Sequence, residues 1–279
     1  MPSVLPYVLL LYFCAADLVR AGTLVQFRTP LGDLPVELFD DNKPVTVDNF
    51  LRLTRAGRYQ NTFIQRCATN FVLQGGGYRV TTPASTQVIT TVFAVSHFGA
   101  ITNEFLAGRV ISNTFGTIAM AKVSGQPNSA TCHWFFNLND NSANLNNQNG
   151  GFTVFGRLLG DTNMLNSFNA RSPGNGLVNA GATFPTLPVL YSGTNDPRYT
   201  DLIYVDITPL QVAVSNAPVG GSAISWLSVS NWTHVVEYTD EFPPAWQELI
   251  RTNGNGERLT VSDPNESPGR FYRVRVEHP

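Results

Sequence analysis

The fold of this protein is decided by the stretch Phe63-Ile64-Gln65-Arg66-Cys67-Ala68-Thr69-Asn70-Phe71-Val72-Leu73-Gln74-Gly75-Gly76-Gly77. Two short runs of strand-forming residues, 62–67 and 71–74, overlap this stretch, which ends in three consecutive glycines. Short runs rich in apolar and β-branched residues favour β-strands, whereas a helix needs a longer amphipathic pattern. The stretch is therefore predicted to form two short strands.

Similar strand patterns lie on both sides of this stretch. Residues 24–27 and 34–39 flank a turn at 29–33 and predict a β-hairpin, in which Pro35 favours an edge position. Further strands are predicted at 117–121, 134–138, 153–157 and 202–207. Many short strands of this kind are typical of a closed β-barrel or a sandwich.

Two helices are predicted between the strands. The first has Thr46 as its N-cap and ends before Gly57, because apolar residues recur at helical spacing between these positions. Asp161 caps a second, shorter helix that runs through Phe168. Residues 171–200 are rich in Gly, Asn and Pro and show no periodicity, so a long loop is predicted there.

Four more motifs accompany the opening stretch. They are Glu37-Leu38-Phe39 with 44–50, Gly116-Thr117-Ile118-Ala119-Met120-Ala121, Asn128-Ser129-Ala130-Thr131-Cys132-His133-Trp134-Phe135-Phe136-Asn137, and Phe152-Thr153-Val154-Phe155-Gly156-Arg157. In this order and spacing, the five motifs resemble the cyclophilin family of peptidyl-prolyl cis-trans isomerases, over residues 23–207. The resemblance implies a mainly β fold: a closed eight-stranded antiparallel barrel with two capping helices and a peptide groove on its outer surface.

The resemblance also implies the residues of the site. Arg66 falls on the catalytic arginine of the family. The positions that it implies for substrate binding are Phe71, Val72, Gln74, Ala121, Lys122, His133, Phe135, Leu145 and Phe152. The implied partners are Xaa-Pro segments of unfolded or flexible polypeptides, and no cofactor is implied.

The chemistry of prolyl isomerisation also suits an arginine beside an apolar cup. Twisting the prolyl bond breaks amide resonance and meets a barrier of about 18–20 kcal/mol, so catalysis must stabilise the twisted form. The prolyl nitrogen becomes basic as resonance is lost. A permanently charged donor such as Arg66 then bonds that nitrogen better in the twisted state than in the planar one.

Two departures from the family pattern leave alternatives open. His133 stands where the family has a second groove glutamine, so the activity is expected to be weaker or pH-dependent. A second hypothesis is therefore a catalytically weak chaperone that binds proline-containing peptides. Cys67 and Cys132 stand one residue along from Arg66 and His133. Strand alternation predicts both on the side opposite the groove, as either a disulfide or two buried thiols.

Charge and composition exclude other classes of protein. The chain has 18 Lys+Arg against 20 Asp+Glu and a net charge of -2, so it offers no basic field to nucleic acid or anionic lipid. With 43% hydrophobic and only 14% charged residues, it is not a disordered chain. The four histidines lie far apart and the cysteines lack the spacing of zinc ligands, so no metal site is predicted.

The two ends of the chain predict further segments. Residues 1–21 contain a short apolar run followed by small residues, which is typical of a cleaved secretory signal peptide. We expect an exported bacterial protein, periplasmic or extracellular, with no membrane attachment after cleavage. The isomerase domain is expected at 22–208 as a monomer, with a linker at 209–221 and a small all-β module at 222–279.

The C-terminal module contains three of the four tryptophans of the chain. They are either core residues of a small domain or a platform that stacks against sugar rings. The second reading gives a third hypothesis for the whole chain, a surface adhesion or carbohydrate-binding protein that uses this module.

Overall fold

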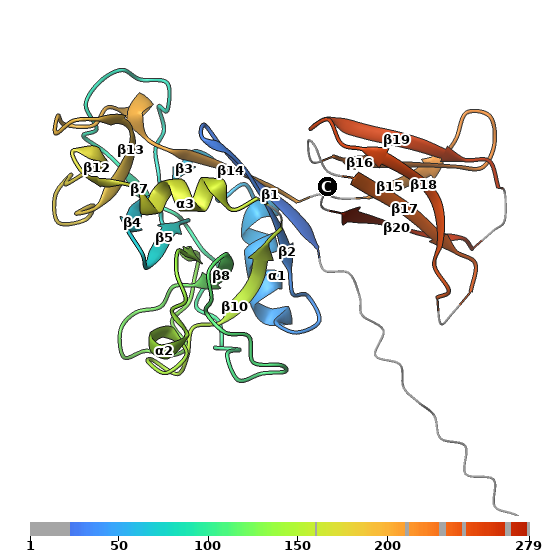
Figure 1. Cartoon of the computed structure of the whole chain (residues 1–279), viewed down its shortest axis with the longest axis horizontal. Coiled ribbons are helices and arrows are strands. Elements are labelled where there is room, and N and C mark those ends of the chain that lie inside the picture. Colours follow the sequence, from blue (N-terminus) through green and yellow to red (C-terminus); the bar gives the residue numbers. More distant parts are fainter. Residues whose placement is uncertain are drawn as a thin grey trace, which may run out of the picture.

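The computed structural model describes residues 23–159, 161–209, 212–228, 233–241, 244–265 and 269–277. The predicted signal peptide lies outside the described residues. Strands dominate the structure, and Figure 1 shows them in two bodies that follow one another along the chain. The first body contains all five sequence motifs, and the second begins at Ala213.

The first body is built on one curled sheet. Its strands are β1 (Leu24–Thr29), β2 (Gly32–Leu38), β3 (Thr62–Phe63), β4 (Arg66–Ala68), β5 (Val72–Gly75), β6 (Tyr78–Arg79), β7 (Phe93–Ala94), β8 (Thr117–Met120), β9 (Trp134–Asn137), β10 (Val154–Leu158) and β14 (Tyr204–Pro209). Hydrogen bonds order them β4-β5-β9-β8-β10-β2-β1-β14-β3-β6-β7. Every pairing in this sheet is antiparallel.

The sheet closes into a barrel because β3 and β4 are two halves of one bent strand. Only Ile64 and Gln65 separate them. The N–H of Ile64 donates to the carbonyl of Ile203 at 2.9 Å, whereas the N–H of Gln65 donates to the carbonyl of Gln74 at 3.0 Å. The bent strand therefore pairs with β14 at its start and with β5 at its end. When β3 and β4 are counted together, β1, β2, β5, β8, β9, β10 and β14 complete the predicted eight-stranded antiparallel barrel.

Alternate side chains of the strands fill the barrel with aromatic rings. Phe27 packs edge-on against Trp134, with ring centroids 5.1 Å apart, and against Phe136 at 5.3 Å. All three side chains are fully buried. Burial of such large rings is the main source of stability for short strands that are weak by themselves.

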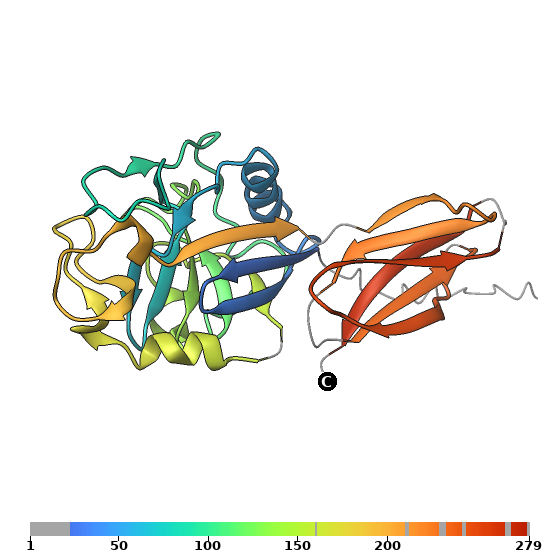
Figure 2. The same cartoon turned by 90° about the horizontal axis from the view of Figure 1, so that it is seen from above.

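Two helices cover opposite sides of the barrel, as predicted (Figure 2). They are α1 (Pro44–Arg55) and α3 (Asn163–Asn169), and the one-turn helix α2 (Ser142–Leu145) and a 3₁₀ turn at Tyr199–Asp201 are additional. The prediction of Thr46 as N-cap is wrong, because α1 begins at Pro44, whose fixed φ suits a first helical turn. The Glu104 carboxylate instead accepts bonds from the N–H groups of this first turn.

Residues 171–200 are not the long loop that their composition predicts. They contain β11 (Ser172–Pro173), β12 (Asn175–Val178) and β13 (Leu187–Ser192), which form a three-stranded sheet. Leu187 and Val189 of β13 pack with Phe63 in a second apolar cluster beside the barrel. Turns interrupt these strands every few residues, so no periodicity is visible in the sequence.

The second body consists of two three-stranded sheets. One has the order β15 (Ala213–Asn216), β16 (Ser222–Leu227), β19 (Arg258–Asp263), and the other β18 (Gln247–Asn253), β17 (Thr233–Thr239), β20 (Phe271–Glu277). Ile224, Trp226 and Val236 are buried between them. The predicted linker at 209–221 is too long, because β15 lies inside it and pairs along its whole length with β16.

The tryptophans of the second body contribute to its packing. Trp226 is buried, and its indole N–H donates to Nδ1 of His234 at 3.0 Å. Trp246 is partly buried beneath the Arg273 guanidinium, 4.4 Å from the ring centroid. The third tryptophan, Trp232, lies outside the described residues. Trp226 and Trp246 therefore do not form an open stacking platform.

Within the part of the chain that the structure describes, no helix has the length and apolar character needed to cross a membrane.

Candidate active site

Two neighbouring rows of side chains cross β4, β5, β9 and β8 and point to opposite sides of the barrel wall. The outer row, in strand order, is Arg66, Gln74, Phe135 and Ala119. The inner row is Cys67, Leu73, Phe136 and Ile118, and all four of its members are fully buried. Residues that pair directly across strands share a face, and successive residues alternate. Because the inner row belongs to the barrel core, the outer row faces outward.

Apolar side chains gather around the Phe135 end of the outer row. The members of this outer cluster are Val72, Ala119, Phe135, Leu145 and Val154, with Phe39, Ala68, Phe71, Ile111, Ala121 and Phe152 packed against them and partly open. Phe135 and Phe152 meet edge-on with ring centroids 5.9 Å apart. Six residues that the sequence places in the substrate site lie in this cluster: Phe71, Val72, Ala121, Phe135, Leu145 and Phe152.

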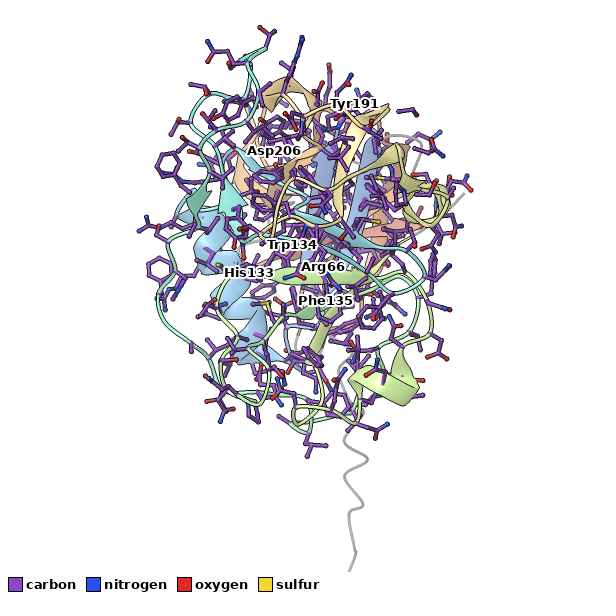
Figure 3. All side chains as sticks on the ribbon, turned by 90° about the vertical axis from the view of Figure 1, so that its left-hand side faces the viewer. Arg66, His133, Trp134, Phe135, Tyr191 and Asp206 are labelled. Atoms are coloured by element: carbon purple, nitrogen blue, oxygen red, sulfur yellow. The ribbon has the colours of Figure 1, made fainter. Side chains whose placement is uncertain are left out.

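Arg66 lies at the other end of the outer row, partly exposed, with Gln74 between it and Phe135. Figure 3 shows Arg66, His133 and Phe135 over the same part of the sheet. The positively charged guanidinium of Arg66 thus lies next to the outer cluster, on the outer surface of the barrel. This arrangement can hold an apolar ring while it offers a charged donor to an atom beside that ring.

His133 is held by two glutamines and a tyrosine ring. Its Nδ1 lies 2.9 Å from Nε2 of Gln65 and 3.4 Å from Nε2 of Gln74, so the ring accepts a hydrogen bond there in its neutral form. Tyr78 packs edge-on against His133, with centroids 5.9 Å apart. Burial, together with the nearby charge of His97, lowers the pKa of His133. His133 is therefore neutral at pH 7.

The three consecutive glycines allow Cys132 and His133, which precede β9, to approach closely. A Cβ on Gly77 would lie 2.0 Å from the His133 ring, and a Cβ on Gly76 would lie 2.6 Å from the Cys132 carbonyl. Gly76 also has a φ of +76°, which side chains disfavour. The glycine run thus sets the position of His133.

Lys122 supports the outer cluster rather than projecting into solvent. Its ammonium donates to the carbonyls of Asn149 at 2.8 Å and Gly151 at 2.6 Å, and it lies 4.7 Å from the centroid of the Phe152 ring. Burial lowers the pKa of Lys122 to about 8. The side chain of Lys122 therefore fixes the loop that carries Phe152, in addition to the predicted role of its backbone at the strand edge.

The sequence contains one other lysine, Lys43, and it has a similar role that the sequence reasoning missed. Its buried ammonium lies 2.5 to 3.4 Å from four carbonyl oxygens between Glu104 and Arg109, which share its three N–H donors. The adjoining ring of Phe105 lies so close to Gly151 that a Cβ there would meet it at 2.1 Å. Lys43 therefore stabilises the segment that packs against the loop of the outer cluster.

Gln65 and Tyr78 were also missed as parts of the site. Gln65 is buried, and its Oε1 accepts a bond from the N–H of Gly77 at 3.0 Å while its Nε2 faces His133. The bend between β3 and β4 turns this side chain toward His133. The adjacency of Gln65 to Arg66 was the available signal, but a regular strand would have placed the two side chains on opposite sides.

The disulfide considered between Cys67 and Cys132 is absent, and both residues are buried free thiols. Strand alternation correctly predicts that both belong to the barrel core. They point to different neighbours, however. Cys67 Sγ lies 3.6 Å from the Phe168 carbonyl of α3, whereas Cys132 Sγ lies 3.8 Å from the Val95 carbonyl, beyond β7. Burial raises the pKa of Cys67 to about 11, so this thiol stays protonated at neutral pH.

Comparison with known proteins agrees with this fold and arrangement. The family model described as "Cyclophilin type peptidyl-prolyl cis-trans isomerase/CLD" matches residues 24–186. The peptidyl-prolyl cis-trans isomerase of Acinetobacter baylyi is 33% identical over 140 residues, which cover 50% of this chain and 68% of the relative. Peptidyl-prolyl cis-trans isomerase B of Escherichia coli is 36% identical over 140 residues, covering 49% and 77%. Peptidyl-prolyl cis-trans isomerase cyp18 of Streptomyces antibioticus is 38% identical over 139 residues, covering 48% and 75%.

The barrel, its outward-facing arginine and apolar cluster, and these matches define the class of the protein. The chain belongs to the cyclophilin-type peptidyl-prolyl cis-trans isomerases. It is an enzyme of this class, and its substrates are proline-containing peptides.

Proposed function

We propose that this isomerase acts on Xaa-Pro bonds of exported polypeptides and that Arg66 stabilises the twisted prolyl bond. The observation that carries the mechanism is the outer row, in which Arg66 and Phe135 share one face with only Gln74 between them. In this proposal the apolar side chains of the outer cluster bind the proline ring of the substrate. The guanidinium then lies beside the bond that must rotate.

The mechanism needs differential binding rather than covalent chemistry. The planar amide nitrogen is a poor acceptor because its lone pair is delocalised into the carbonyl. In the twisted state that lone pair is localised, so an N–H of Arg66 stabilises the transition state more than either planar isomer. No bond to the protein forms, and the proposal calls for no cofactor.

The export part of the proposal rests on residues 1–21. An apolar run between Val4 and Ala16, followed by Val19-Arg20-Ala21, supports a cleaved signal peptide. Proteins that leave the cytoplasm must fold after translocation, and slow prolyl isomerisation limits the folding of many chains. Cell fractionation with N-terminal sequencing tests this part: we expect a mature chain that begins at Gly22 outside the cytoplasm. A chain that keeps Met1 and stays in the cytoplasm would contradict it.

The mechanism is tested by prolyl isomerisation of a short Ala-Pro peptide, followed by NMR exchange. Arg66→Ala should lower kcat/KM by about 100-fold to 1,000-fold, the usual loss when one preorganised transition-state donor is removed. The matched control is Arg79→Ala, because Arg79 is an exposed arginine of the same sheet, on β6, and lies outside the outer row. We expect this control to keep the activity of the unchanged chain.

Two results would contradict the mechanism. One is near-normal turnover by Arg66→Ala. The other is an equal loss in Arg66→Ala and Arg79→Ala, which would point to a general effect of surface charge. If the unchanged chain binds the peptide but does not accelerate its isomerisation, the binding-only chaperone is the better description.

A further inference from the structure

A pocket with an apolar floor lies beside the barrel, and none of its lining residues belongs to the outer cluster. It has a volume of about 520 Å³, within the range of about 300–1,000 Å³ that is usual for ligand sites. Its floor consists of four buried residues, Phe63, Phe184, Leu187 and Leu202. The sheet β11-β12-β13, which the floor borders, lies next to β4 in both views (Figures 1 and 2).

The outer wall of this pocket is held in place by hydrogen bonds. It is formed by residues 88–92, which include the partly exposed Ile89 and Val92. The N–H of Ile89 donates to the carbonyl of Pro197 at 2.9 Å. The hydroxyl of the buried Tyr199 accepts bonds from the N–H groups of residues 90 and 91. The pocket is therefore already formed in the free protein, so a ligand pays little ordering entropy.

One ring contacts both the pocket and the polar end of the outer row. Tyr78 packs edge-on against Phe184 of the pocket floor, with centroids 5.0 Å apart, and also edge-on against His133, which lies beside Gln74, with centroids 5.9 Å apart. These two ring-to-ring steps together span at most about 11 Å, which an extended chain covers in about three residues. A polypeptide that occupies the groove can therefore place a later side chain in the pocket.

The chemistry of the lining selects the kind of side chain. The floor is aliphatic and aromatic, whereas the wall combines the apolar Val88, Ile89 and Val92 with two threonines, and Asn179 and Thr183 add further uncharged polar groups. The charged residue of the lining is Asp196, which is exposed. No lysine or arginine lines the pocket, so an acidic side chain would find no counter-charge there. A large uncharged side chain fits both the volume and the character of the site.

We propose that this pocket is a specificity subsite of the isomerase, which binds one large apolar side chain of the same polypeptide whose proline occupies the groove. The inference rests on the proposed function of that groove. The subsite prefers Phe, Leu or Trp a few residues away from the proline, on the side of the chain that runs past His133. It thereby selects segments that are buried in folded proteins and exposed in unfolded ones.

The experiment compares peptides that differ in one residue. The reference is a blocked alanine and glycine peptide with one central Ala-Pro bond, and each test peptide carries one Phe at a position two to six residues from the proline, on either side. We expect a rise in kcat/KM of about fivefold or more, mainly through KM, at one or two adjacent positions on one side only. Glu at the preferred position should give no rise.

Two variants connect this preference to the pocket. Val88→Glu places a charge on the pocket wall at a residue that is 45% exposed, so the fold should tolerate it. Val88→Glu should abolish the increase in kcat/KM that the Phe-containing peptide shows over the reference peptide. It should leave turnover of the reference peptide unchanged. The matched control is Val214→Glu, because Val214 is 52% exposed and lies on β15 in the second body. This control should keep both activities.

Failure of the subsite is distinguishable from failure of the proposed function. Normal turnover of the reference peptide with no Phe preference at any position would overturn the subsite alone, and so would a preference that Val88→Glu does not change. If the reference peptide is not isomerised at all, fluorescence anisotropy of labelled peptides decides instead. Tighter binding of the Phe peptide that Val88→Glu abolishes would support the subsite, and equal binding of both peptides would overturn it.

Discussion

The inner and outer rows run side by side across the same strands, yet their composition differs in a way that separates stability from function. The inner row is entirely apolar and fully buried, with Phe136 among its members. The outer row has an apolar end at Phe135 and a polar, partly exposed end at Arg66. Packing explains every residue of the inner row. It does not explain a guanidinium on the rim of an apolar cluster, and binding of a substrate does.

The largest effect should come from two substitutions that are one residue apart. Phe136→Ala removes a ring from the barrel core and should lower the free energy of unfolding by about 3–5 kcal/mol. Phe135→Ala also removes a buried ring, 4% exposed, but the residues packed against this ring are partly exposed, so water can enter the space that the ring leaves. This substitution should therefore cost less stability than Phe136→Ala but should remove most of the isomerase activity. Urea unfolding and peptide isomerisation measure the two effects. If the two variants lost equal stability and Phe135→Ala kept its activity, the inner row could not be called structural and the outer row functional.

A smaller effect is expected at Lys122, which supports the outer cluster from behind. Lys122→Met keeps most of the side-chain volume but loses two hydrogen bonds and the charge over Phe152, so the loop that holds this ring becomes less ordered. We expect kcat/KM to fall about tenfold, mainly through a higher KM, since about 1.4 kcal/mol of binding is lost. Lys122→Arg should retain part of the kcat/KM that Lys122→Met loses, because arginine keeps the positive charge. An unchanged KM in Lys122→Met would show that the outer cluster does not need this support.

The pH dependence should reveal the state of His133 at the edge of the outer row. Because its pKa in the folded chain lies below the unfolded value of about 6.5, protonation of His133 should lower the activity only below about pH 6.5. A separate change is expected near pH 8, where Lys122 loses its charge. Protonation turns Nδ1 into a donor, so the bond from Gln65 is lost at a cost of about 1 kcal/mol, or about fivefold in kcat/KM. His133→Gln should remove this acid limb.

The lowered pKa of His133 also makes the free energy of unfolding depend on pH. The unfolded chain binds a proton at His133 more readily than the folded chain, so this residue contributes stability above about pH 6.5 that is lost as pH falls through the folded pKa. The difference in unfolding free energy between the unchanged chain and His133→Gln should therefore change only below pH 6.5. A change centred above pH 7 would contradict the lowered pKa.

The smallest effect should follow from removal of the second body. No apolar cluster among the described residues contains members of both bodies, and β14, the last barrel strand, ends at Pro209. A chain that ends at residue 211 should therefore fold cooperatively and isomerise a short Ala-Pro peptide within about twofold of the full chain. Loss of either property would mean that the second body helps to complete the barrel or its outer face.

Most of the barrel could be predicted from the sequence because its strands carry strong local signals. The hairpin at 24–39 and the short apolar runs around Trp134 and Val154 are recognisable from residue type alone. Their order, together with the motifs around Arg66, is enough to indicate the family. The sheet at 172–192 and strand β15 were not predictable in this way, because their few residues gain stability from partners that are distant in the chain.

The residue types of the site can be read from the sequence: an arginine, a glutamine and a set of apolar residues at the spacing of one family. The contacts of each side chain, in contrast, depend on the folded chain. The bend at Ile64 and Gln65 both closes the barrel and turns Gln65 toward His133, and a regular strand pattern cannot express such a bend. The two lysines obtain their roles from carbonyl groups that lie 27 to 66 residues away along the chain. Local patterns specify strands, whereas contacts at that separation exist only once the chain has folded.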